Sequence, residues 1–548
     1  MSVRPRRRLA LTGLMAFAVL GAPPARSAID LHTATIADVN AAFADGSLTS
    51  EQLLRAYLAR IDAYDKKGPM INAVITLNAH ALDEARQRDA ERRAGRIRGP
   101  LHGIPIVLKD NFDTFDLPTT AGSQLLAGSM PPDDAFVVKK LRDAGAVIVA
   151  KLNLHEFAAG GGVSGSTDPA DYKAAAIPNG FSSMGGQTRN PHELDHGPAG
   201  SSTGTAAAIA AGFAQFGMGS DTTSSVRGPA SATGIVGLKP TNGLLSRDGI
   251  VPLALSLDTA GPMARSVYDV AYALNVMAGV DPADAMTLRA QGRVESDYTA
   301  FLRRGALRGR RIGIARDFGG QNADVDTVFE AAVRTLRSLG AATVDVHYPD
   351  YLLAAHNELA SIICAAEFKA QIADYLKTLG PQFPKTLADL ARLANDPATH
   401  YRSPQKAYGL NYTQAHAPAI DDPAYRVAKN QGMAMVKGAV DAVLQKDRLD
   451  AIVYLSTPNA APLIAPSPNP GPAKPKSSAY NIANLAGYPD LVVPAGMTSD
   501  GLPVTVSFLG PAFSDGPLLG YGYDFEQATH ARRLPKFTPP LPGDRIGH

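Results

Sequence analysis

The spacing of hydrophobic residues predicts alternating helices and short buried strands in the first part of the chain. Apolar residues between Leu53 and Ile61 recur at the spacing of one helix face, and Thr49 precedes them as a capping residue. The next predicted elements are a helix with a solvated, charged face at 79–94, strands at 104–108 and 146–150, and a helix at 136–142. Such alternation is typical of an α/β sheet.

After about residue 310 the pattern continues with a larger share of helix. The expected elements are strands at 311–315 and 342–346, a helix at 325–339, mostly helical sequence over 350–445, a Pro-rich connector at 464–476, and strands at 491–494 and 504–508 around a turn at Gly501. No internal repeat is evident. One large α/β unit with an inserted or appended helical portion is therefore the simplest arrangement.

A long stretch without periodicity separates these two parts. Residues 160–204 hold many Gly, Ser, Asn and Pro residues, which predicts a long loop, and long ordered loops in compact domains are usually functional. The Ala- and Gly-rich sequence over 205–219 predicts a closely packed, buried helix.

Composition and charge exclude several classes of protein. The 548 residues are 45% hydrophobic and 19% charged, which is ordinary for a globular protein. The formal net charge of +2 and the lack of a basic stripe indicate no nucleic-acid partner. Cys364, the single cysteine, lies in an apolar setting that favours a core residue over a reactive thiol.

The N-terminus has the pattern of a bacterial signal peptide over residues 1–27. Arginines at positions 4 and 6–8 precede an apolar run from Leu9 to Leu20, and small residues precede a cleavage point near Ala28. The alternative, a membrane anchor, is disfavoured because the run is too short to span a bilayer. We therefore expect a periplasmic or secreted protein without stable membrane insertion, and the arginines leave both the Sec and the Tat route open.

Serine-rich segments carry the candidate chemistry. The stretch 197–204, GPAGSSTG, contains a G-x-S-x-G pattern centred on Ser202, but no strand leads into it and no downstream histidine has a recognisable triad setting. A serine needs a base, and a buried lysine with a lowered pKa can serve. Lys109, at the end of the buried strand 104–108, is a candidate; the alternative is a core-edge lysine paired with Asp110.

A longer pattern follows these segments. Residues 197–241 combine G-S-S-x-G, an Ala/Gly-rich stretch, S-D-T, S-V-R-x-P and G-x-V-G-L-K-P-T, and this combination resembles the signature of the amidase signature family. The segments GIPIVLKDNF, AKLNLHEFA, GGQTRNP, LDTAGPMARSV and GLPVTVSFLG are similar to members as well. The resemblance spans about 30–530 and is weakest over 350–475.

The resemblance implies a Ser-Ser-Lys triad. Ser225 matches the acylated nucleophile, Ser201 the bridging serine that follows a cis peptide, and Lys109 the base. Backbone N–H groups of the segment 222–225 would hold the oxyanion; its other members are Thr222, Thr223 and Ser224. Relatives often have Gly-Gly where this chain has Thr223-Ser224, which puts the shape of the bound acyl group in doubt.

Neighbouring residues have supporting roles in this interpretation. Ser202 either hydrogen-bonds within the site or forms a local turn, and the sequence does not choose between these roles. Asp221 and Arg227 are expected to hold the nucleophile turn by an ion pair. His155, Glu156 and His192 have no partners at metal-ligand spacing, and no nucleotide-binding fingerprint is present, so neither a metal nor a cofactor is expected.

The resemblance also implies a fold and an activity. The fold would be α/β, with a central mixed β-sheet covered by helices on both faces. A single domain over 28–548 would comprise a catalytic core (about 70–310), a helical substrate-facing region (about 350–475) and C-terminal strands (about 480–530). The function would be an exported amidase acting on a small-molecule or peptide amide, with water as second substrate; a homodimer is compatible with this. Alternatives are an ester, carbamate or aryl-acylamide hydrolase, a component of an amidotransferase, and a non-catalytic binding protein.

Overall fold

The computed structural model describes residues 29–465 and 479–546, together with Met1. The predicted signal peptide and most of the Pro-rich connector lie outside the described residues. Among the described helices, none has the length and apolar character needed to cross a membrane.

One mixed sheet of 11 strands runs through the molecule, in the order β11-β10-β12-β14-β13-β8-β9-β7-β3-β4-β2. Its strands are β2 (Val74–Leu77), β3 (Pro105–Lys109), β4 (Val147–Leu152), β7 (Phe216–Asp221), β8 (Val236–Lys239), β9 (Thr259–Ala264), β10 (Arg311–Ala315), β11 (Ala342–Val346), β12 (Ala451–Leu455), β13 (Asp490–Met497) and β14 (Pro503–Leu509). Two small pairs stand apart, β1 (Ile29–Asp30) with β15 (Arg545–Ile546), and β5 (Phe181–Ser182) with β6 (Gly186–Gln187).

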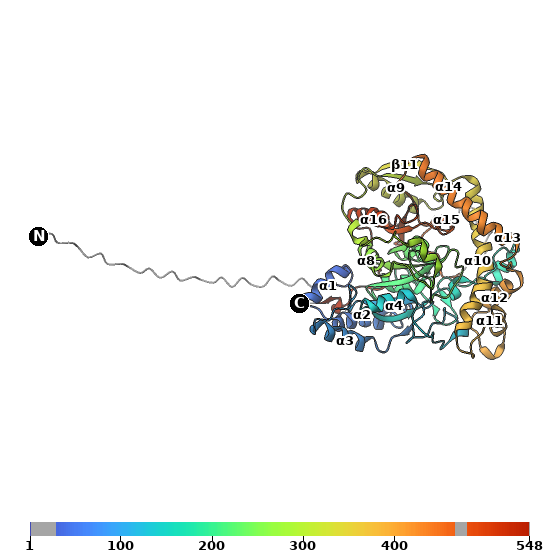
Figure 1. Ribbon diagram of the computed structural model, residues 1–548, viewed down its shortest axis with the longest axis horizontal. Coiled ribbons are helices and arrows are strands. Elements are labelled where there is room, and N and C mark those ends of the chain that lie inside the picture. Colours follow the sequence, from blue (N-terminus) through green and yellow to red (C-terminus); the bar gives the residue numbers. More distant parts are fainter. Residues whose placement is uncertain (2–28, 466–478, 547–548) are drawn as a thin grey trace.

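Helices cover both faces of the sheet, as the sequence predicts (Figure 1). They are α1 (Ile36–Ala44), α2 (Ser50–Tyr64), α3 (Ala81–Arg93), α4 (Phe136–Asp143), α5 (Pro169–Ala174), α6 (Thr203–Ala210), α7 (Arg227–Thr233), α8 (Val267–Met277), α9 (Ala323–Ser338), α10 (Asp350–Thr378), α11 (Leu387–Ala394), α12 (Pro404–His416), α13 (Pro423–Val427), α14 (Met433–Lys446), α15 (Tyr480–Ala486) and α16 (Asp515–Thr529).

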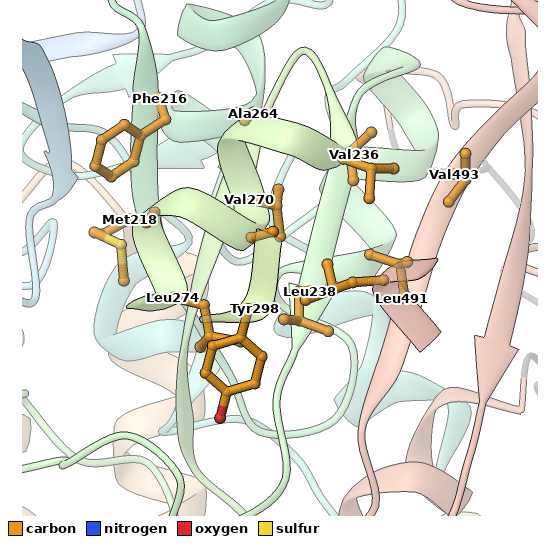
Figure 2. Close-up of a cluster of buried hydrophobic side chains, with 14 of the residues drawn as sticks. Phe216, Met218, Val236, Leu238, Ala264, Val270, Leu274, Tyr298, Leu491 and Val493 are labelled. Carbon is orange, nitrogen blue, oxygen red and sulfur yellow. The ribbon is translucent and has the colours of Figure 1, made fainter. Parts of the chain in front are cut away.

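The hydrophobic core forms two layers, one on each face of the sheet, because side chains alternate between the faces along each strand. Ile106 and Leu108 of β3 join the cluster that contains α1, α4, α8, α9 and α16, whereas Val107 joins the cluster of α6, α10, α14 and α15. Consecutive side chains of a strand point to opposite faces, so one short apolar run supplies both layers. Figure 2 shows part of the first layer, where Phe216 and Met218 of β7 lie near Val270 and Leu274 of α8.

Two sequence expectations are wrong in detail. The predicted helix over 205–219 ends with α6 at Ala210; Gly212 has a positive φ of 71°, and the chain then enters β7 at Phe216. Glycine adopts that backbone conformation without a side-chain clash, so it ends the helix. The mostly helical sequence expected over 350–445 is confirmed by α10 to α14, but the wider helical region expected over 350–475 also contains β12, which joins the main sheet between β10 and β14. Helices α10 to α13 of this region lie together along one side of the molecule (Figure 1).

Candidate active site

Lys109 ends β3, which pairs in parallel with β4 on one side and β7 on the other. Its side chain is fully buried, and Nζ lies 2.7 Å from Ser201 Oγ and 2.8 Å from Ser220 Oγ. Asp110 does not pair with Lys109, because its carboxylate lies 3.2 Å from Nζ of Lys151. Of the two sequence interpretations of Lys109, the pairing with Asp110 is therefore wrong.

The surroundings of Lys109 favour the neutral amine. Burial lowers the pKa of Lys109 to about 7, and the nearby carboxylates of Asp221 and Asp258 oppose this shift only in part. A lysine in bulk water has a pKa near 10.4 and is almost wholly protonated at neutral pH. Lys109 is thus able to accept a proton under ordinary conditions, which a solvated lysine is not.

The segment that contains Ser201 is held close to β3. The Gly200–Ser201 peptide is cis, the conformation that the resemblance implied. A Cβ on Gly200 would lie 2.2 Å from Nδ1 of His155, so a side chain there would collide with the imidazole ring. The backbone N–H of His155 donates to the Ser201 carbonyl at 3.0 Å.

Ser202 connects the two serine-rich segments. Its backbone N–H donates to the Ser225 carbonyl at 3.1 Å, and its Oγ donates to the Ser220 carbonyl at 3.3 Å. Ser202 is also the residue that precedes α6, and it makes no capping bond with its side chain. Of the two roles considered, the structure therefore favours hydrogen bonding within the site.

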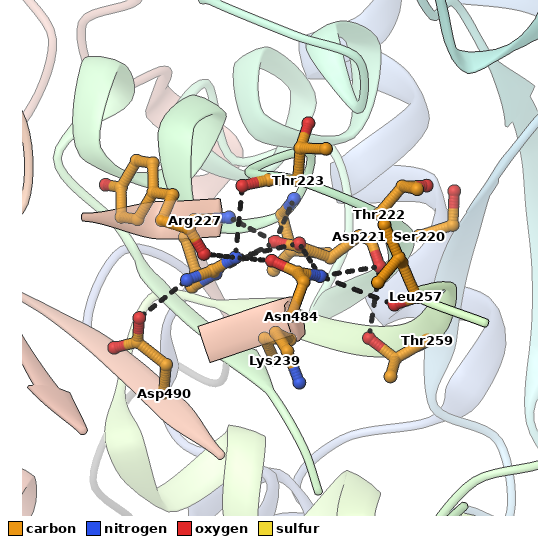
Figure 3. Close-up of polar contacts among 12 residues, drawn as sticks. Ser220, Asp221, Thr222, Thr223, Arg227, Lys239, Leu257, Thr259, Asn484 and Asp490 are labelled. Atoms are coloured by element: carbon orange, nitrogen blue, oxygen red, sulfur yellow. Dashed lines mark hydrogen bonds and ion pairs between the residues drawn. The ribbon is translucent and has the colours of Figure 1, made fainter. Parts of the chain in front are cut away.

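Ser225 lies in the turn between β7 and α7, and an ion pair fixes this turn. Asp221 accepts the backbone N–H of Val226 at 3.0 Å, and the Arg227 guanidinium donates to both oxygens of Asp221 at 3.0 Å. Arg227 also lies 2.6 Å from Asp490 on β13 (Figure 3). Burial alone would raise the pKa of Asp221, but Arg227 lowers it to about 2, so the carboxylate stays ionised. The expected ion pair is confirmed.

Ser201 and Ser225 both line a cavity of about 360 Å³. Thr223 and Ser224 line it too. Thr222 does not; it lines a separate, much smaller cavity behind the turn. The wall also includes His155, Gly200, residues 158–162 and 164 of a glycine-rich loop, Leu253, six residues of α10, Thr413 of α12 and Asn481 of α15.

His155 contributes a neutral imidazole to this wall. Its Nε2 lies 3.0 Å from the backbone N–H of Gly180, so Nε2 accepts and Nδ1 carries the proton. Burial, with a smaller contribution from the charge of Lys109, lowers the pKa of His155 to about 4. Sequence reasoning tested this histidine as a metal ligand and missed its place at the cavity.

Sequence reasoning also missed a residue near Lys109 and a residue of the cavity wall. Asn111 Nδ2 donates to Ser220 Oγ at 3.0 Å, and Ser220 in turn contacts Lys109. Asn111 follows Lys109 by two residues, a spacing that could have drawn attention to it. No comparable signal marks Cys364 of α10, which is partly exposed on the cavity wall instead of wholly in the core. Burial raises the pKa of its thiol.

This arrangement can carry out acyl transfer. A neutral amine contacts one serine hydroxyl, and that serine shares a cavity with a second serine in a turn held by buried charges. The backbone N–H groups of Thr223, Ser224 and Ser225 donate to no acceptor in the part of the chain that the structure describes. Within the same residues, no three His, Cys, Asp or Glu side chains are arranged to hold a metal ion.

A family model described as Amidase matches residues 52–519. The chain belongs to the amidase signature family. Its fold is similar to that of the peptide amidase of Stenotrophomonas maltophilia, with 40% identity, a TM-score of 0.83, and coverage of 92% of this chain and 99% of the other. A peptide amidase in complex with the competitive inhibitor chymostatin gives 42% identity, a TM-score of 0.84 and the same coverage.

Curated relatives of this amidase signature protein include an amidase and amidotransferase components. A probable amidase of Arabidopsis thaliana is 33% identical over 519 residues, which cover 93% of both chains. A glutamyl-tRNA(Gln) amidotransferase component of Acidothermus cellulolyticus is 36% identical over 511 residues, covering 92% of this chain and 96% of the relative. Family and fold together identify an amide-hydrolysing enzyme.

Proposed function

We propose that this amidase cleaves a carboxamide bond through an acyl-Ser225 intermediate, with Ser201 as proton relay and Lys109 as base. The observation that supports this most strongly is the 2.7 Å contact between Lys109 Nζ and Ser201 Oγ, made by an amine whose pKa is about 7. Ser225 lines the same cavity as Ser201. A nucleophilic serine requires a base, and this contact places one beside the serine that would relay the proton.

In the first half of the reaction, neutral Lys109 takes the proton of Ser201 while Ser201 takes that of Ser225. Ser225 Oγ then bonds to the substrate carbonyl carbon, and the backbone N–H groups of Thr223, Ser224 and Ser225, which line the cavity, stabilise the oxyanion. Collapse of this intermediate breaks the C–N bond, and the proton returns from Lys109 through Ser201 to the leaving nitrogen. Water then attacks the acyl-enzyme by the same relay, which releases the carboxylic acid and restores Ser225.

For the substrate, we propose amides of peptides and of comparable neutral acyl groups. Support comes from the peptide amidases at 40% and 42% identity, and a cavity of about 360 Å³ has room for an acyl group larger than acetyl. Ester, carbamate and aryl-amide cleavage use the same acyl-enzyme. Glutamine hydrolysis is the second candidate, favoured by the glutamyl-tRNA(Gln) amidotransferase relatives.

A substrate panel tests these choices. Peptide amides, fatty and aryl amides, p-nitroanilides, esters, carbamates and free glutamine are compared by kcat/KM. We expect the highest values for peptide amides; a highest value for glutamine would overturn the choice of substrate. Ser225→Ala is the control and should turn over none of them.

We further propose that the protein is exported, on the basis of the basic and apolar pattern in residues 1–27. Fractionation of a bacterial host followed by N-terminal sequencing tests this. Mature protein in the periplasm or medium that starts near Ala28 is expected, and an intact N-terminus in the cytosol would contradict it. Whether the mature enzyme forms a homodimer stays a prediction for sedimentation analysis.

A further inference from the structure

The proposed role of Lys109 places a strict demand on the direction of its hydrogen bonds. A neutral lysine amine has two N–H donors and one lone pair. If it is to take a proton from Ser201, its lone pair must face Ser201 Oγ, 2.7 Å away. The two N–H groups then donate to the other oxygens near Nζ, which are Ser220 Oγ at 2.8 Å and the Ser220 carbonyl at 3.4 Å.

Ser220 must therefore act as an acceptor toward Lys109. Its hydroxyl oxygen has two lone pairs and one hydrogen. Lys109 occupies one lone pair, and Asn111 Nδ2 occupies the other at 3.0 Å. The Ser220 hydrogen needs a third partner, and no described residue accepts it. If this hydrogen turned toward Lys109 instead, the amine lone pair would face Ser220 and not Ser201.

A small cavity adjoins Ser220 and offers room for that partner. Its volume is about 10 Å³, close to the smallest space that holds one water molecule. Its polar lining residues are Ser220, Thr222, Arg247, Asp258 and Thr259. It shares Ala158 and Leu253 with the substrate cavity.

Asp258 has the acceptor capacity that such a water requires. Its Oδ1 accepts the Thr222 hydroxyl at 2.5 Å, and its Oδ2 accepts the backbone N–H groups of Leu253 and Ala254, each at 3.0 Å. A carboxylate has about four lone-pair sites, so these three bonds leave one. Burial raises the pKa of the Asp258 carboxyl, and the same three donors oppose this shift in part because they favour the ionised form.

We propose that one water molecule occupies this cavity, accepts the Ser220 hydroxyl hydrogen and donates to the Asp258 carboxylate. This water would fix Ser220 as an acceptor, so that Lys109 presents its lone pair to Ser201. Ser220 and Asp258 are then positioning residues that act through Lys109. The proposal rests on the proposed function of Lys109 as the base.

The charges around Lys109 give this proposal a distinctive pH signature. Asp221 and Asp258 both favour protonated Lys109. Asp221 is paired with Arg227, whereas the arginine that acts on Asp258 is Arg247, whose guanidinium is bound to Asp284. His155 is neutral above a pH of about 4. Loss of the charge on Asp258 should therefore let Lys109 deprotonate at lower pH.

Crystallography tests the water itself and needs no activity. A high-resolution structure of the wild-type enzyme should show an ordered water within hydrogen-bond distance of Ser220 Oγ and an Asp258 oxygen. A well-ordered cavity wall without water density would overturn the proposal. If Lys109→Met were instead fully active, the proposed function would fail, whatever this structure showed.

Asp258→Asn tests the positioning role in solution. Asp524→Asn is the matched control, because Asp524 is also buried and accepts two backbone N–H groups, from Gly305 and Leu307. The acid limb of kcat/KM should move to lower pH in Asp258→Asn and stay in place in Asp524→Asn. An unchanged acid limb in folded Asp258→Asn would contradict the proposal.

Ser220 provides a second pair of variants in case Asp258→Asn does not fold. Ser220→Ala removes the acceptor of the Lys109 N–H, and a misoriented base should lower kcat by about 100-fold with little change in KM. Ser220→Thr keeps the hydroxyl and should recover most of that loss. Wild-type kcat in Ser220→Ala would overturn the proposal, as would an equal loss in both variants.

Discussion

Lys109 and Lys151 are both fully buried on adjacent parallel strands, but their partners differ. Lys151 of β4 pairs with Asp110 at 3.2 Å and donates to Thr119 Oγ1 at 2.7 Å. Lys109 of β3 has hydroxyl oxygens nearest to its Nζ. Burial lowers the pKa of both lysines, but only Lys151 has a carboxylate in direct contact. Burial by itself therefore does not identify a base; the immediate partners distinguish the two.

The pleat of the sheet produces this difference. Lys109 and Asp110 are neighbours in sequence, which makes an ion pair between them plausible. Successive side chains of an extended chain point in opposite directions, so Asp110 faces away from Lys109 and toward the neighbouring strand. There Lys151, which lies opposite Leu108 in the register of β3 and β4, meets it.

Replacement of Lys109 should give the largest effect in this comparison. Lys109→Met fills the same buried space without an amine, so the fold should persist while kcat falls by about 10²- to 10⁴-fold, the usual contribution of a general base. Steady-state kinetics with circular dichroism checks both statements. A folded Lys109→Met enzyme with wild-type kcat would contradict the proposed role of Lys109 as the base, since Lys109 would then have only a structural role, as Lys151 does.

Lys151→Met should instead lower stability. Without its partner, the buried carboxylate of Asp110 is uncompensated, which typically costs about 3–5 kcal/mol in the free energy of unfolding. Denaturant unfolding measures this cost. The double variant Lys151→Met with Asp110→Asn should regain much of the loss, whereas a stable single variant would show that the ion pair is not needed.

The pH dependence of kcat/KM in the wild-type enzyme tests the role of Lys109 without any mutation. A base must be unprotonated, and the pKa of Lys109 is about 7. Below this pKa, kcat/KM should rise by about tenfold for each pH unit, and above it the curve should level off. A profile that is flat from pH 5 to 8 would contradict a base of this pKa.

Replacement of a third buried lysine, Lys406, should have the smallest effect on the enzyme. Its Nζ donates to the carbonyls of Gly160 and Gly161, which belong to the cavity wall, and burial lowers its pKa to about 8. Lys406→Met should loosen this wall, because a hydrogen bond from a charged group contributes about 1.5–3 kcal/mol. We expect a raised KM with kcat nearly unchanged. A large loss of kcat would place Lys406 closer to the chemistry than the structure does.

The spacing of hydrophobic residues predicted the helices and strands whose formation depends mainly on residues close together in the sequence. Strands β3 and β4 and helices α4 and α9 lie within two residues of their expected bounds. The break between α6 and β7 was missed, because Ala- and Gly-rich sequence suits both a packed helix and a buried strand. Only sheet pairing decides between them, and it is a long-range property.

The site was predictable to a similar extent. The family resemblance named Lys109, Ser201 and Ser225 as the members of one triad. Their catalytic roles stay predictions. The resemblance placed a substrate-facing region at about 350–475, but the individual wall residues of α10 were not predictable, because Asn357 and Phe368 reach the cavity through packing of segments far apart in sequence. The link from Ser220 to Asn111 likewise depends on the parallel pairing of β3 and β7.

Covalent labelling tests whether Ser225 is the nucleophile. Wild-type enzyme and Ser225→Ala are treated with an acylating inhibitor, and intact mass and peptide mapping locate the adduct. We predict one adduct on Ser225 in the wild type and none in Ser225→Ala. Equal labelling of Ser225→Ala, or an adduct on Ser201 or Ser202 in the wild type, would show that Ser225 is not the nucleophile.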